Sequence, residues 1–282
     1  TNSKDDFLMC KRLVPLCVTY MDGYKVSASL LASKLELPLL SYKNANSNQQ
    51  GSILLVSDCG LAIHQLEKST PGPISFDFIG SSVNHRRLYG GGINQDLVKA
   101  IGIRSMNQQL FVLDLMAGLG RDGFILASLG STVLMLERNK IVAALLADGL
   151  DRARNIKSNH GIDFKKILNR ISLLTVDAKD YLNKLGDTSK PDVIYLDPMF
   201  PSREKSSKVK KEMQLLHQLV GLDGDAGQIL SIARKKAKYR VVVKRPARGK
   251  FLGDQEPGYS LKGKSTRYDI YPIKKIPTEF IR

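Results

Sequence analysis

The sequence predicts an α/β protein in which a Rossmann-like, doubly wound parallel sheet follows a smaller α+β N-terminal domain. Three observations predict this fold. From Phe111 onward, apolar segments of strand length alternate with segments of helical spacing, as expected for a parallel sheet that helices cover on both faces. A glycine-rich turn follows the first strand, and the sequence Asp-Pro-Met-Phe-Pro follows a later one. Sheets of this kind bind ligands at the carboxyl ends of their strands.

The first 80 residues are predicted to form the smaller domain. Its strands are expected at residues 13–20, 53–56, 61–66 and 74–79, and a helix at 26–37 that stops before Pro38. The turn sequence SDCG at 57–60 indicates that the second and third strands form a hairpin.

Residues 81–110 are expected to connect the two domains through a helix and a glycine-rich linker. The basic stretch at 85–87 and the three glycines at 90–92 fit a flexible basic arm as well as a surface helix followed by a hinge. Residues 111–282 then form the main domain. Its strands are expected at 111–115, 132–137, 171–176, 193–197 and 240–244, with a later edge strand at 267–273. Its helices are expected at 122–129, 140–154, 179–185, 209–219 and 226–237.

The charge of the chain indicates a polyanionic partner. Its 43 lysines and arginines exceed its 27 acidic residues and give a net charge of +16. From Pro201 onward, 20 basic residues against 8 acidic ones place +12 of that excess in 82 residues. Because no basic amphipathic helix accompanies this charge, nucleic acid is favoured over a membrane as the partner. Charge that serves solubility alone is the alternative.

Other classes of protein and site find little support. No apolar run approaches the roughly 20 residues that span a bilayer, and no signal peptide is recognisable, so a cytoplasmic protein is expected. Cys10, Cys17 and Cys59 form no CxxC pair and are expected to be free thiols. The four histidines are scattered, and no metal site is expected. The oligomeric state stays open, with a monomer as the default.

The turn after the first strand is a candidate nucleotide pocket. Gly118 and Gly120 allow a tight turn and a close backbone approach to a ligand that a Cβ would block. Asp114 closes the strand, where its carboxylate could hold an ammonium group, and the turn lacks the full GxGxxG of dinucleotide-binding proteins. S-adenosylmethionine, whose amino-acid part carries an ammonium, therefore fits better than a dinucleotide. A plain turn between strand and helix is the alternative.

Residues after the next two strands extend this pocket. Glu137 lies 23 residues after Asp114, where a carboxylate can accept hydrogen bonds from both hydroxyls of a ribose. It could instead favour a helix N-terminus. Arg138 could lie along an adenine. Asp177 and Ala178 are placed to meet the adenine edge, and Asp177 is also placed to cap the next helix.

The segment after the fourth strand predicts the chemistry. An exocyclic amine is a poor nucleophile because its lone pair is delocalised into the base, and acceptors for its hydrogens favour the geometry that frees that pair. Asp197 offers one acceptor and the carbonyl of Pro198 another, while Phe200 can stack on the base. The alternative is a proline-rich loop whose phenylalanine packs in the core. Basic residues beyond it would grip phosphates: Arg203, Lys205, Lys208, Lys210, Lys211, Lys244, Arg245, Arg248 and Lys250.

Between Ile74 and Tyr271 the chain resembles the small-subunit ribosomal RNA guanine-N2 methyltransferases of the J type. The resemblance rests on FDFIGSSVNHRRLYGGG, DLMAGLGRDGFILASLG, MLERNKIVAALLADGL, VIYLDPMFP, KVKKEMQLLHQLVG and RVVVKRP. It implies a class I S-adenosylmethionine-dependent methyltransferase sheet. It also implies a bacterial cytoplasmic enzyme that methylates N2 of a guanosine in 16S ribosomal RNA, as free RNA or within the small ribosomal subunit.

The same resemblance implies cofactor contacts at Arg121 and Asp122, at Glu137 and Arg138, and at Asp197. Relatives look more serine-like where this chain has Asp177 and Ala178. The amine-holding role of Asp197 comes from its chemistry rather than from the resemblance, and one carboxylate at that strand end could face both ligands.

Three other functions stay open from the residues alone. The DPMF segment resembles the NPPY and DPPY segments of amino-methyltransferases that act on adenine or on DNA. The chain could also be a non-catalytic RNA-binding protein with a vestigial nucleotide pocket, or a dinucleotide oxidoreductase. The choice of guanine over adenine rests on the resemblance.

Overall fold

The computed structural model describes residues 15–45, 51–66, 73–80, 82–105, 108–156, 161–199, 219–220 and 223–277. The chain divides into two compact units. The first comprises Thr1–Phe76, Asn139–Gly149 and Met199–Leu222, and the second comprises Asp77–Arg138, Leu150–Pro198 and Asp223–Arg282. The second unit therefore takes in the connecting residues from Asp77 onward together with the main sheet.

The first unit contains a three-stranded sheet in the order β1-β2-β3. β1 (Val18–Tyr20) pairs in parallel with β2 (Ser52–Ser57), and β2 pairs antiparallel with β3 (Gly60–Gln65). The predicted hairpin is thus confirmed. The helices of this unit include α1 (Lys25–Leu35), which contacts β1 and β2, and the short α2 (Tyr42–Ala45). Val18, Leu54 and Ile63 form its core, each at most 1% exposed.

The strand predicted at 74–79 is wrong beyond its first residue. Ile74 forms one antiparallel bridge with Ile63. Further on, the carboxylate of Asp77 accepts hydrogen bonds from the backbone N–H groups of Ile79 (2.8 Å) and Gly80 (3.0 Å). A side chain that satisfies nearby backbone groups competes with strand pairing, so the chain turns here.

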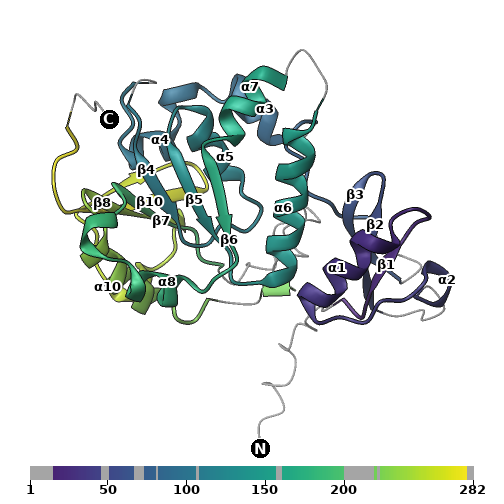
Figure 1. Cartoon of the computed structure of the whole chain (residues 1–282). Helices are drawn as coiled ribbons and strands as arrows, with labels where there is room; N and C mark the ends of the chain where they lie inside the picture. The colour runs from purple at the N-terminus through teal and green to yellow at the C-terminus, as the bar shows by residue number, and fades with distance from the viewer. Residues whose placement is uncertain are drawn as a thin grey trace, which may run out of the picture. The chain divides into compact units, whose positions relative to one another are not determined.

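A seven-stranded sheet forms the centre of the second unit, in the order β6-β5-β4-β7-β8-β10-β9 (Figure 1). The first five of these strands are parallel, and β10 runs antiparallel to both of its neighbours. The strands are β4 (Phe111–Asp114), β5 (Thr132–Leu136), β6 (Ile171–Leu174), β7 (Val193–Leu196), β8 (Arg240–Pro246), β9 (Tyr259–Lys262) and β10 (Thr266–Pro272). The predicted doubly wound α/β sheet is confirmed, and β9 is an addition to it.

Helices cover both faces of this sheet. The connections from β4 to β5 and from β6 to β7 cross the sheet in opposite directions, so their right-handedness places α5 and α8 on opposite faces. α3 and α7 contact α5, whereas α10 contacts α8. The helices are α3 (Ser82–Tyr89), α4 (Asp96–Ile101), α5 (Arg121–Ser128), α7 (Gly161–Leu168), α8 (Ala178–Lys184) and α10 (Ala226–Lys236). Single 3-10 turns lie at η2 (Gly92–Asn94), η3 (Asp187–Ser189) and η4 (Leu252–Asp254).

Most predicted helices are confirmed to within one residue at each end. α5, α8 and α10 lie where the sequence places them, and α6 (Lys140–Arg154), whose residues belong partly to each unit, has the predicted bounds. The helix predicted at 209–219 lies outside the described residues except for Leu219. α7 was not predicted.

The central strands are apolar because helices cover them on both faces. Every residue of β7 is buried, and Val241, Val242 and Val243 of β8 are 0% exposed. Such continuous apolar runs are typical of buried parallel strands. Tyr195 brings a phenol into this core at 1% exposure, and a buried phenol requires a hydrogen-bond partner.

The described residues contain no helix long and apolar enough to cross a membrane. Within the same residues, no cluster of three or more His, Cys, Asp or Glu side chains is arranged to hold a metal ion. Cys17 is buried, Cys59 is exposed, and both are free thiols as predicted. Cys10 lies outside the described residues.

We expect Gly227→Ala to destabilise the second unit. A Cβ at Gly227, in the first turn of α10, would lie 2.9 Å from the backbone Cα of Gly253. Backbone cannot move aside as a side-chain end can, so overpacking should cost about 1–3 kcal/mol. Denaturant unfolding measures this loss. The control is Gly224→Ala, because a Cβ there meets nothing within 4 Å; equal losses in both variants would contradict the expectation.

Candidate functional site

The carboxyl ends of the parallel strands collect acidic side chains. β4 and β7 are neighbours, yet the chain leaves them toward opposite edges of the sheet, so the strand order reverses between them. Ligands bind outside such a reversal in doubly wound sheets. Asp114 is the last residue of β4, Asp197 follows β7 and Glu137 follows β5. The structure therefore brings three of the predicted acidic site residues to the edge where a ligand is expected.

The turn between β4 and α5 has the geometry that its glycines predict. Gly118 and Gly120 have φ angles of +51° and +65°, which side chains other than glycine's rarely allow. The backbone N–H of Gly118 donates to Oε2 of Glu137 at 2.9 Å. A Cβ placed on Gly118 would meet nothing within 4 Å. The turn is thus held from below by Glu137 and has open space beside Gly118.

Asp114 is a buried carboxyl group with few compensating contacts. It is 2% exposed, and its Oδ1 accepts a hydrogen bond of 3.3 Å from the backbone N–H of Met116. Burial raises the pKa of Asp114 to about 8, and the nearby carboxylates of Asp122, Asp197 and Glu137 add to the rise. Asp114 is therefore mostly protonated at neutral pH. A cation bound beside it would lower this pKa and recover the negative charge.

Glu137 supports the turn rather than a helix end. It is 5% exposed, and its carboxylate accepts the hydrogen bond from Gly118 already described. The cap of α6 is Asn139, whose side-chain oxygen accepts from the N–H groups of Ile141 (3.0 Å) and Val142 (3.1 Å). The alternative role of Glu137 at a helix N-terminus is therefore not the one seen. Its predicted contact with a ribose stays a prediction.

Arg138 is surrounded by three acidic side chains. Its guanidinium pairs with Asp223 and with Asp225 (3.3 Å), and it lies 3.9 Å from Asp177. Asp177 also caps α8, because its Oδ1 accepts from the backbone N–H groups of Lys179 (2.8 Å) and Asp180 (3.3 Å). The predicted cap is confirmed. Ala178 is buried as the first residue of α8, and contacts of Arg138, Asp177 and Ala178 with an adenine stay predictions.

Strand register places four polar side chains on one face of the sheet. Asp114 lies opposite Tyr195 in the β4–β7 pair, and Leu196 lies opposite Val243 in the β7–β8 pair. Asp197 and Lys244 come next on their strands and are therefore neighbours. Because residues two apart on a strand share a face, Tyr195 and Asp197 point the same way. α5 covers this face: a Cβ on Gly123 would lie 3.5 Å from Oδ2 of Asp114.

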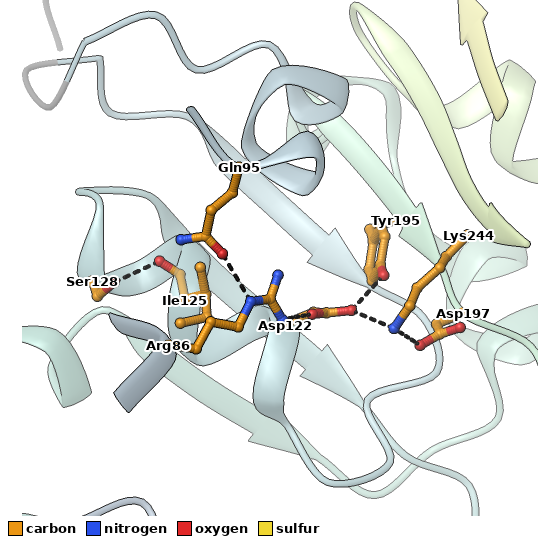
Figure 2. A network of polar contacts seen from close by, with 8 residues as sticks. All are labelled: Arg86, Gln95, Asp122, Ile125, Ser128, Tyr195, Asp197 and Lys244. Carbon is orange, nitrogen blue, oxygen red and sulfur yellow. Dashed lines mark hydrogen bonds and ion pairs between the residues drawn. The ribbon is translucent and has the colours of Figure 1, made fainter. Parts of the chain in front are cut away.

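Asp122, in the first turn of α5, receives three donors from other elements (Figure 2). Its Oδ1 accepts from Arg86 of α3 at 2.6 Å, and its Oδ2 accepts from the Tyr195 hydroxyl at 2.7 Å and from Lys244 at 2.9 Å. Burial alone would raise the pKa of Asp122, but Lys244 and Arg86 outweigh burial and hold it well below its usual range. Asp122 is a permanent anion at the base of the site.

Lys244 joins Asp122 to Asp197. Its ammonium also donates to Oδ2 of Asp197 at 2.7 Å (Figure 2). The prediction that Lys244 and Arg245 grip phosphates is wrong. Lys244 is occupied by two carboxylates, and Arg245, which is 7% exposed, donates from Nε to the carbonyl of Lys250 at 2.8 Å. Arg248 and Lys250 are exposed, and their contact with phosphates stays a prediction.

Sequence reasoning missed Arg86, Gln95 and Tyr195 as parts of the site. Arg86 was read as part of a basic arm or surface helix; it is instead oriented by Gln95, whose Oε1 accepts from Nε of Arg86 at 2.8 Å. The available signal for Tyr195 was its place in an otherwise apolar strand. No local signal pointed to Gln95.

Several predicted residues lie outside the described part of the chain. They include Phe200, which was expected to stack on a base, and the basic residues Arg203, Lys205, Lys208, Lys210 and Lys211. Pro198 is described and buried. Arg121 begins α5, with its backbone at the glycine turn. The roles of all these residues stay predictions.

The residues of this edge fit a nucleoside that carries an ammonium group. Open space beside Gly118 admits a ligand close to the backbone. Asp114 offers a carboxyl group whose charge a ligand ammonium would stabilise, and Glu137 and Asp177 offer oxygens at the ends of the next two strands. Asp114 and Glu137 are the residues best placed to hold such a group.

A family model described as "Putative SAM-dependent methyltransferase" matches residues 36–273 of the chain, where SAM is S-adenosylmethionine. Among curated proteins, a "Ribosomal RNA small subunit methyltransferase J" from Cellvibrio japonicus is 44% identical over 89% of this chain and 94% of its own length. A protein of the same name from Pseudomonas paraeruginosa is 46% identical over 87% of this chain and 89% of its own length.

A solved structure is similar along nearly the whole chain. It is a SAM-dependent methyltransferase from Neisseria gonorrhoeae, 33% identical, with a TM-score of 0.68. The similarity covers 90% of this chain and 95% of that one. At this identity and score, both the fold and its order of elements are shared.

We expect the stability of the protein without ligand to fall as the pH rises from about 4 to about 8, in part because of Asp114. The folded pKa of about 8 lies above the ordinary value of 3.8, so in this window the folded state holds a proton that the unfolded state releases. Each pH unit then costs up to about 1.4 kcal/mol. Asp114→Asn removes this penalty, so its unfolding free energy relative to the wild type should increase with pH. A pH-independent difference in urea unfolding would contradict the assignment.

Proposed function

Because the chain belongs to the family of S-adenosylmethionine-dependent methyltransferases, we propose that it methylates the exocyclic N2 of a guanosine in small-subunit ribosomal RNA. The names of the relatives that are 44% and 46% identical support ribosomal RNA of the small subunit as the substrate. The net charge of +16 supports a polyanionic substrate of this kind. A cytoplasmic location accords with that substrate.

The position of Asp197 carries the proposal. It follows β7 directly at the reversal of strand order, next to the turn that begins at Asp114. Its side chain is 36% exposed, whereas that of Asp122 is only 9% exposed. Asp197 is therefore the open end of the charged network in Figure 2, and a base that enters the site meets its carboxylate first.

S-adenosylmethionine supplies a methyl group on a sulfonium, a good leaving group for transfer to nitrogen. The buried carboxyl of Asp114 binds the ammonium of its amino-acid part, and Glu137 binds its ribose. These contacts fix the donor relative to the strand ends, which lowers the entropic part of the barrier.

Asp197 and the carbonyl of Pro198 act on the nucleophile. Two acceptors for the hydrogens of the amine draw its lone pair out of conjugation with the base, an interaction that strengthens as the N–C bond forms. The new N–C bond forms as the S–C bond breaks, with its electrons left on sulfur. The amine then loses one proton, which Asp197 accepts and passes to water at its exposed side.

Asp197→Ala should lower methyl transfer by about 10²–10⁴-fold, the usual range for a lost proton acceptor. The assay combines the protein, labelled S-adenosylmethionine and small subunits that lack the modification, and the label is assigned by nucleoside analysis. Asp187→Asn is the control, because the Asp187 side chain is 85% exposed and pairs with Lys190; it should transfer at the wild-type rate. Label on an adenine, on DNA or on protein alone would reject the proposal.

Cofactor binding should release a proton near neutral pH. An ammonium beside Asp114 lowers its pKa from about 8, so up to about one proton leaves for each cofactor bound at pH 7, and fewer at pH 9. Calorimetry in buffers of different ionisation enthalpy counts the protons. Asp114→Asn should weaken binding by about 10–100-fold and abolish the release. A wild-type protein that binds with no proton release at pH 7 would place the ammonium elsewhere.

A further inference from the structure

Lys244 connects two carboxylates of unequal exposure. Its ammonium lies 2.9 Å from Oδ2 of Asp122 and 2.7 Å from Oδ2 of Asp197. The side chain of Lys244 is 28% exposed, between the 9% of Asp122 and the 36% of Asp197. Lys244 thus lies along the path from the buried end of the network to its open end (Figure 2).

The two carboxylates depend on Lys244 to different degrees. Asp122 also receives Arg86 on Oδ1 and the Tyr195 hydroxyl on Oδ2, so it keeps two donors without the lysine. For Asp197, Lys244 is the side-chain donor that the described residues provide, and Oδ1 of Asp197 accepts no hydrogen bond within that part of the chain. Loss of Lys244 would therefore free Asp197 and leave Asp122 held.

The backbone defines this arrangement as well as the charges do. Asp197 and Lys244 come directly after the paired residues Leu196 and Val243 of adjacent parallel strands. A lysine at this register on β8 reaches the strand-end carboxylate sideways and contacts a single oxygen. The other oxygen is left toward the open side.

From this geometry we propose that Lys244 is a positioning residue for methyl transfer: it binds Oδ2 of Asp197 to the fixed anion Asp122 and leaves Oδ1 to accept from the target amine. This inference rests on the proposed function. It assigns to Lys244 an action through Asp197, without contact between the lysine and the RNA.

Electrostatics give the proposal a measurable sign. Burial raises the pKa of Asp197, Lys244 opposes the rise and Asp122 adds to it. Burial alone would lower the pKa of Lys244, but both carboxylates raise it well above its usual value, so the lysine stays an ammonium. The titratable groups whose charges act with Asp197 are Lys244, Asp122, Asp223, Asp114, Tyr195 and Tyr268. Removal of the one cation among them leaves the Asp197 carboxylate harder to ionise.

The experiment compares the pH dependence of kcat/KM for wild type, Lys244→Gln, Lys244→Arg and Arg86→Gln. In Lys244→Gln we expect the acid limb to move up by about 1–3 pH units, the range for a lost opposite charge, with kcat reduced about tenfold per unit at pH 7 and KM for RNA little changed. Lys244→Arg keeps the charge and should keep the acid limb near that of the wild type. Arg86→Gln removes a cation from Asp122 without touching Asp197, so its acid limb should stay in place even where it lowers the melting temperature.

A second measurement does not need the RNA substrate. The ¹³C carboxyl signal of Asp197, identified by its absence in Asp197→Asn, should titrate at higher pH in Lys244→Gln than in the wild type. If wild type transfers no methyl group to small-subunit RNA while this signal shifts, the proposed function fails and the Lys244–Asp197 contact stands. An unshifted signal, an unshifted acid limb in Lys244→Gln, or equal shifts in Lys244→Gln and Arg86→Gln would overturn the positioning role. If Lys244→Gln does not fold, Lys244→Met is titrated in its place against the same outcomes.

Discussion

Like charges crowded into a desolvated strand edge are the constraint on which this site depends. Asp114, Asp122, Glu137 and Asp197 all act on one another electrostatically, and four unpaired anions cannot share a poorly solvated place. The structure resolves each one differently. Asp122 receives two cations and a phenol, Glu137 accepts a backbone N–H, Asp114 retains its proton, and Asp197 combines one ammonium with partial access to water.

This division of charge explains how one edge can bind a cation and also handle a proton. Asp122 never changes its charge, so it serves as an anchor. Asp114 becomes charged when a cation arrives, and Asp197 lies where a proton can leave to solvent. Because the dipoles and charges are fixed by strand register and by α5, little reorganisation is needed during the reaction, which is the usual source of electrostatic catalysis.

The sequence reveals much of the fold because its signals are local. Apolar runs for β4 to β8, the Asp177 cap and the glycines of the first turn each act within a few residues, and each appears where expected. α7 and β9 were missed because both are short and rely on tertiary packing. The role of Lys244 could not be read locally: its partners are 47 and 122 residues away in the chain, and only the parallel register of β7 and β8 makes them neighbours. In sequence, KRP resembles any other basic surface stretch.

The bond between Arg86 and Asp122 changes where the catalytic domain begins. α3 and α4 precede the first strand of the main sheet, and Leu97, Val98 and Ile101 of α4 are at most 1% exposed. These residues belong to the same compact unit as the sheet, which starts at Asp77. A fragment cut at the start of β4 would keep every strand of the doubly wound sheet and both site carboxylates, yet it would lose the guanidinium that helps to keep Asp122 ionised. The thermodynamic border of the domain thus lies more than thirty residues upstream of the border that its sheet suggests, at a position set by an ion pair.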